Sequence, residues 1–274
     1  MEASESGLVT RSPQMGDVGF MSSISISCIV FACIFGGTLL GMILRVFLPE
    51  QHLNTESKDV VKLGMGLIGT MTALVLGLLI ASAKSSFDTQ RNGLAQLSAN
   101  CILLDRTLAH YGTESKDARD MLRASVADML AHTWPEENRQ SGQAVAKMGT
   151  EGRYEGLYEK IQQLAPKNDV QRAIQAQALK TGSDIAQMRW LMFSQKGSSI
   201  PTPFLVVMVC WLTLILASFS LFAPSNATVF STLLVCALAV SSAVFLILEL
   251  DRPFDGMIQI SSAPLRSALE QLGR

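Results

Sequence analysis

The chain has 274 residues, of which 49% are hydrophobic and only 16% carry a charged side chain. Soluble domains average roughly 25% charged residues, so this composition excludes an ordinary soluble enzyme and favours a membrane protein. The formal net charge of -1 provides no field that would attract nucleic acid, which is therefore not an expected partner.

Residues 1–22 predict a disordered N-terminal tail followed by a first membrane helix. Acidic side chains stand where a cleavable signal peptide would carry basic ones, at Glu2, Glu5 and Asp17. The next tract, Val18 to Leu44, contains no charge and is apolar from about Ile24. Because about 20 such residues cross a hydrocarbon core as a helix, this tract predicts the first transmembrane span.

A second uncharged tract, Leu63 to Ala83, predicts a helix that leaves the membrane and continues in water. No proline interrupts the chain between Lys62 and Tyr111. Residues 23–83 therefore hold the first two predicted membrane helices. Lys62 and Lys84 bracket the second span; around an oligomer they would form basic rings that attract anions, or they simply fix the depth of the helix.

Two neighbouring rows of residues distinguish the second span. Small residues form a stripe that lets another helix approach closely, at Gly66, Gly69, Ala73, Gly77 and Ala81. Beside it, Thr70, Leu74 and Leu78 could face a symmetry axis, where rings of leucine gate a pore by dewetting. Spacing alone favours helix packing over a pore.

Beyond the membrane the same helix carries a row typical of a coiled coil. Its members recur at steps of three and four: Leu94, Leu97, Cys101, Leu104, Leu108 and Tyr111. We interpret this row as an oligomer seam, with Arg91, Asp105 and Arg106 off the seam. Residues 84–199 as a whole predict a helical domain with a polar loop from Glu136 to Gly149, because strand signals are absent.

Residues 200–249 predict two more membrane helices. The 52 residues from Gly197 to Leu248 contain no charged residue and no histidine. A tract of this length is too long for one membrane crossing. Turn-forming residues at 223–226 divide the tract into spans of about 200–222 and 227–248. Residues 250–274 form a C-terminal segment. The predicted fold class is therefore all-α, with four transmembrane helices and a helical bundle inserted between the second and third.

Four spans place both termini and the 84–199 domain on one side of the membrane. The bias of basic residues assigns that side to the cytoplasm. The five cysteines show no CxxC pair, and the three histidines, His52, His110 and His132, lie apart. We therefore expect no metal site, cofactor or catalytic group, and we do not expect the protein to be an enzyme.

Two motifs resemble a known family. The first runs from VLGL at residues 75–78 to FDTQR at 87–91, and the second is LDRPFDG at 250–256. With the four spans and the helical insert, they resemble the bestrophin-like domain family of bacterial membrane proteins, distant relatives of bestrophin anion channels. The resemblance implies a multi-pass protein of the bacterial inner membrane.

The resemblance also implies a homo-oligomer, pentameric in bestrophins, whose second helices line a pore for chloride or another small anion. Aligned on Gly77, the apolar neck of bestrophins falls on Thr70, Leu74 and Leu78, the row that spacing had already proposed. The acidic run of the bestrophin calcium site is reduced to Asp255, with Asp251 upstream. Since calcium needs six or more oxygens, we do not expect calcium gating.

Two hypotheses follow. The first is an oligomeric channel, anion-conducting by resemblance, with its neck on the second membrane helix. The alternative is a non-conducting scaffold or sensor, anchored by the four spans, that pairs with a partner through its cytoplasmic helices. The position of Thr70, Leu74 and Leu78 in an assembly distinguishes the two.

Overall fold

The computed structural model of the chain describes residues 23–48, 55–135, 150–194, 202–224, 226–254 and 256–273. The predicted tail 1–22, the predicted loop 136–149 and Asp255 lie outside the described residues. The helices, in chain order, are α1 (Ser23–Phe47), α2 (Thr55–Tyr111), η2 (Thr113–Ser115), α3 (Lys116–Thr133), α5 (Thr150–Gln162), α6 (Asp169–Ser194), α7 (Thr202–Phe222), α8 (Ala227–Leu250) and α9 (Ala263–Gln271). Within the described ranges there is no strand, so the predicted all-α class is confirmed.

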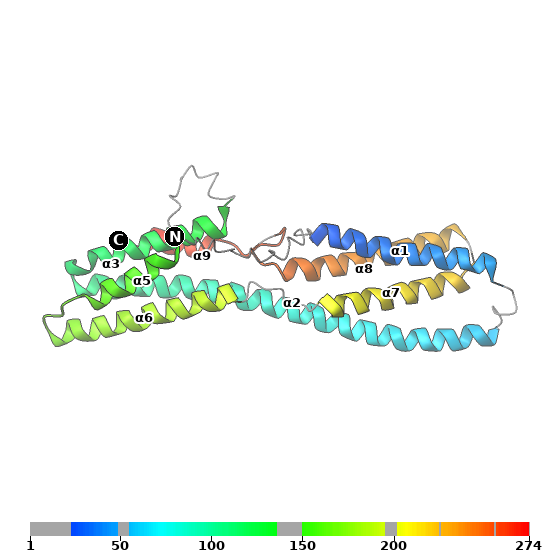
Figure 1. Cartoon of the computed structure of the whole chain (residues 1–274), viewed down its shortest axis with the longest axis horizontal. Coiled ribbons are helices and arrows are strands. Elements are labelled where there is room, and N and C mark those ends of the chain that lie inside the picture. The colour runs from blue at the N-terminus through cyan, green and yellow to red at the C-terminus, as the bar shows by residue number, and fades with distance from the viewer. Residues whose placement is uncertain are drawn as a thin grey trace, which may run out of the picture.

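The molecule is elongated, and α2 runs along nearly its whole length (Figure 1). At 57 residues and 1.5 Å per residue, α2 is about 85 Å long. Helices α7 and α8 pack against its first half, and α1 packs on α7 and α8. Helices α3, α6 and α9 pack against its second half, and α5 packs on α3 and α6. The predicted continuity of this helix, from the apolar span into the helical bundle, is confirmed.

Four helices are long and apolar enough to span a membrane, as predicted. They are α1, α7, α8 and the first part of α2. Their side chains form one apolar cluster that includes Ile34 of α1, Met208 of α7 and Val244 of α8, all fully buried. The membrane half is therefore a four-helix arrangement in which α7 lies between α1 and α2, and α8 contacts both α1 and α2.

The closest helix contact of the membrane half joins α1 to α7. A Cβ atom added at Gly41 would overlap the Ser220 hydroxyl and the carbonyl oxygen of Ala217, and one added at Gly37 would overlap the Thr213 side chain. Gly37 and Gly41 form a GxxxG pair, which allows two helix backbones to approach. At the far end of the same contact, Arg45 Nη1 donates a hydrogen bond to the carbonyl oxygen of Ala223, one of the carbonyls that the end of α7 leaves unpaired.

The predicted packing stripe on α2 does not serve this purpose within the subunit. A Cβ added at Gly66, Gly69 or Gly77 would meet nothing within 4 Å, and Ala73 and Ala81 are exposed. The stripe is therefore open on the single chain. Its role in close packing remains a proposal that concerns another copy.

We expect Gly41→Ala to lower the free energy of unfolding by about 1–3 kcal/mol, because the added methyl group overpacks the contact between α1 and α7. Gly36→Ala is the matched control on the same helix, since a Cβ there would meet nothing within 4 Å. Its stability should be unchanged or slightly raised. Thermal unfolding of the two purified variants in detergent checks the difference, and equal effects would contradict it.

Candidate functional site

The membrane half of α2 has one face that none of the described helices of its own chain covers. On its packed side lie Thr72, Leu79 and Ala83, which are buried against α7 and α8. Leu74 and Leu78 lie on the opposite side and are 63% and 62% exposed, and Thr70 is exposed as well. At 100° per residue, the two sets point in opposite directions around the helix. The predicted neck residues therefore share one open face.

Further apolar side chains extend this face toward the start of α2. Those that are exposed are Val60, Leu63, Leu67 and Met71. The Thr70 hydroxyl donates a 2.8 Å hydrogen bond to the carbonyl oxygen of Leu67, so its proton is used within the helix. The uncovered face is thus predominantly apolar, and it requires lipid or another protein surface to cover it.

Each predicted pore-end lysine has a carboxylate one helical turn away. Lys62 Nζ lies 3.8 Å from Asp59 Oδ1, and both side chains are exposed. Lys84 Nζ donates to Asp88 Oδ1 at 2.7 Å and lies 5.5 Å from the ring centroid of Phe87. Each end of the second span therefore presents a pair of opposite charges. The positions of the two lysines alone did not indicate that each has a carboxylate partner.

The row predicted as an oligomer seam is buried inside the subunit. Leu94, Leu97, Cys101, Leu104, Leu108 and Tyr111 are all 3% exposed or less. All but Tyr111 belong to one apolar cluster with Leu122 of α3, Ile185 of α6 and Leu265 of α9. The row pairs with helices of the same chain, so the prediction that it contacts another copy is wrong in this conformation: its side chains are too buried to reach one.

Cys101 behaves as a packing residue within that cluster. Burial raises the pKa of its thiol to about 12, and the positive charge of Arg189 offsets only part of the increase. The thiol therefore stays protonated near neutral pH and does not act as a nucleophile.

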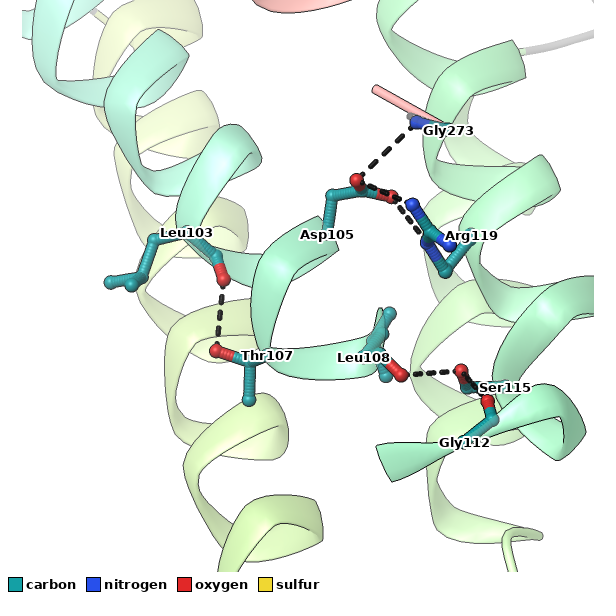
Figure 2. A network of polar contacts seen from close by, with 8 residues as sticks. All are labelled: Leu103, Asp105, Thr107, Leu108, Gly112, Ser115, Arg119 and Gly273. Carbon is teal, nitrogen blue, oxygen red and sulfur yellow. Dashed lines mark hydrogen bonds and ion pairs between the residues drawn. The ribbon is translucent and has the colours of Figure 1, made fainter. Parts of the chain in front are cut away.

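Asp105, predicted to lie off the seam, is a buried charge at the centre of a polar network (Figure 2). It is 1% exposed and accepts hydrogen bonds from Arg119 Nε at 2.8 Å and Nη2 at 2.9 Å. The backbone N–H of Gly273 donates to the same carboxylate at 3.3 Å. The hydrogen bond to Asp105 raises the pKa of the Arg119 guanidinium. One carboxylate thus links α2, α3 and the end of the chain after α9.

The turn between α2 and α3 is closed by a second group shown in Figure 2. Ser115 Oγ donates to the carbonyl oxygens of Leu108 and Gly112, at 2.5 Å and 2.8 Å. Gly112 has a φ of +127°, a conformation that side-chain-bearing residues rarely adopt. The spacing of the seam residues gave no signal that Asp105 would be buried beside this turn.

The family model for a Bestrophin-like domain matches residues 32–265 of the chain. Solved structures of a bacterial bestrophin homologue from Klebsiella pneumoniae have the same fold. Its tryptophan-to-alanine variant has a TM-score of 0.66 at 16% identity and covers 92% of this chain and 97% of that one. Its isoleucine-to-threonine variant has a TM-score of 0.64 at 17% identity, with 90% and 98% covered. Curated proteins provided no match.

Two adjacent leucines of α2 test whether the buried row holds the subunit together. Leu104 is fully buried, whereas Leu103 is 47% exposed. We expect Leu104→Ala to lower the free energy of unfolding by about 2–5 kcal/mol, because it leaves a cavity in the bundle. Leu103→Ala should change it by less than about 0.5 kcal/mol. Chemical denaturation followed by circular dichroism measures both, and a reversed order would show that the row is not part of the core.

Proposed function

The chain belongs to the bestrophin-like family, and we propose on this basis that it forms an oligomeric ion channel. In the proposed assembly, α2 of each copy lines a central pore, and Thr70, Leu74 and Leu78 form an apolar neck. The observation that carries the proposal is the uncovered apolar face of α2, opposite the side that packs on α7 and α8. In a ring of copies this face turns toward the axis.

The open stripe of small residues supports the same arrangement. Its centre lies about 80° around α2 from the centre of the neck row, at 100° per residue. In a ring of helices, the neighbouring copy lies beside the direction of the axis rather than opposite it. Gly66, Gly69 and Gly77 have free space around them in the single chain, so a neighbouring α2 could approach closely there. One row would then face the pore and the other an adjacent subunit.

The finer details of the assembly come from the family resemblance. We propose five copies, an inner-membrane location with the bundle and both termini in the cytoplasm, and a small anion such as chloride as the permeant ion. The paired lysines give the anion preference no support of their own, because Asp59 and Asp88 balance Lys62 and Lys84. Ion preference is therefore a separate question from conduction.

The alternative of a non-conducting scaffold or sensor is not the function that we propose. It required the row from Leu94 to Tyr111 to be available to a partner, and that row is buried within the subunit's own bundle. An enzymatic function is not proposed either, since bestrophins are channels and the chain shows no catalytic constellation among the described residues.

We expect Leu74→Ala and Leu78→Ala to increase the conductance of purified protein in planar bilayers, because smaller side chains widen the neck and make it easier to wet. Leu76→Ala is the matched control, since Leu76 packs against the membrane core of its own subunit. Its single-channel current should match that of the unmodified protein. No current from reconstituted oligomers would refute the channel, and currents unaffected by both neck variants would refute the neck.

We expect Asp88→Asn to shift permeation toward anions, because it leaves Lys84 unpaired and turns the inner ring of the pore basic. In a potassium chloride gradient, the reversal potential should move toward the chloride equilibrium potential. Asp117→Asn, an exposed carboxylate of α3, provides the control for a general change in charge. An unchanged reversal potential would show that the Lys84 ring lies away from the ion path.

A further inference from the structure

The turn that follows α8 occupies the place where the resemblance puts a calcium site. Calcium requires six or more oxygen ligands, mostly from carboxylates and carbonyls. Within the described ranges, no group of three or more histidine, cysteine or acidic side chains could hold a metal ion. The described residues of this turn, which do not include Asp255, therefore contain no such ligand set.

The turn is instead organised around a carboxylate of α8 itself. Glu249, in the last turn of the helix, is 3% exposed. Its Oε2 atom accepts hydrogen bonds from the backbone N–H of Met257 at 2.6 Å and of Ile258 at 3.3 Å. A buried carboxylate needs such donors to offset its lost hydration. Because N–H groups already point at this oxygen, they would repel a cation placed there.

Gly256 shows that the backbone is fitted closely to this carboxylate. It has a φ of +137°, and a Cβ atom at this position would lie 2.6 Å from Glu249 Oε2. Only glycine meets both demands without strain. The backbone N–H of Ile260 donates to the carbonyl oxygen of Pro253 at 2.8 Å and closes the turn.

The closed turn is attached to the bundle through α3. Trp134 Nε1 donates to the carbonyl oxygen of Ile260 at 3.0 Å, and the rings of Trp134 and Phe254 pack in a T-shaped arrangement with centroids 5.9 Å apart. Ile260 and Trp134 are buried in the bundle's apolar cluster. A continuous path of contacts therefore runs from Glu249 of α8, through the turn, to Trp134, the residue that follows α3.

We propose that the Glu249 carboxylate closes this turn by accepting hydrogen bonds from its backbone N–H groups, without a bound cation. In this way Glu249 positions the inner end of α8 on the bundle. Glu249 is a positioning residue in this role. The inference concerns the structure of the turn and does not depend on whether the protein conducts ions.

Hydrogen exchange measured by mass spectrometry on the full-length protein in detergent tests the proposal. In the unmodified protein, exchange in the peptide that contains Met257 and Ile258 should be the same with EDTA and with millimolar calcium. Glu249→Gln should accelerate exchange in this peptide by about tenfold to a hundredfold, the effect of losing a charged hydrogen bond. The Leu94 to Tyr111 region should be unaffected. Glu270→Gln, at an exposed carboxylate of α9, is the control and should change neither region.

Gly256→Ala provides a second variant in which Glu249 is intact. Its methyl group displaces the carboxylate from the turn, so the same peptide should exchange faster even if Glu249→Gln fails to fold. Faster exchange with EDTA, or slower exchange with calcium, would overturn the proposal, because a cation would then close the turn. Unchanged exchange in both variants would also overturn it, as would an equal acceleration along the whole chain, which would indicate a general loss of stability.

Discussion

The unbroken backbone hydrogen bonding of α2 is the constraint on which the rest of the structure depends. Within hydrocarbon no water is available to pair with a free N–H or carbonyl group, so the helix cannot break before it has left the membrane. Here it does not break afterwards either and becomes the central helix of the bundle. Both apolar clusters are therefore built against α2. Because the helix is continuous, it fixes the direction of its uncovered membrane face relative to the side that is buried in the bundle.

The two halves of the molecule solve the packing problem differently. In the bundle, large side chains such as Leu104, Leu122 and Ile185 are withdrawn from water, so hydrophobic burial drives association. In the membrane half, lipid is as apolar as leucine and gives no such drive. Close approach at Gly37 and Gly41, together with the Arg45 bond to the end of α7, takes its place.

Buried carboxylates connect elements that apolar packing alone would leave free to slide. Asp105 joins α2 to α3 and to the C-terminal segment, and Glu249 joins α8 to the turn that docks on α3. Each carboxylate fixes the position of its donor groups, because a buried charge is tolerated only when its hydrogen-bond donors are in place. The connection between membrane helices and bundle is thus specified at particular atoms.

Sequence patterns were enough to predict the four spans, the continuity of α2, the bundle between the second and third spans, and the periodic row from Leu94 to Tyr111. These features depend on residues close together in the chain, where charge, hydropathy and helical spacing can be read directly. The sequence also placed Thr70, Leu74 and Leu78 in one row, although their place at a pore is still a proposal. Which residues each row contacts became clear only from the packing of the helices. It placed α3, α6 and α9 over the predicted oligomer seam, left the small-residue stripe of α2 open, and buried Asp105 and Glu249 against donors. Periodicity shows that one side of a helix is apolar, but the identity of its partner depends on residues far away in the chain.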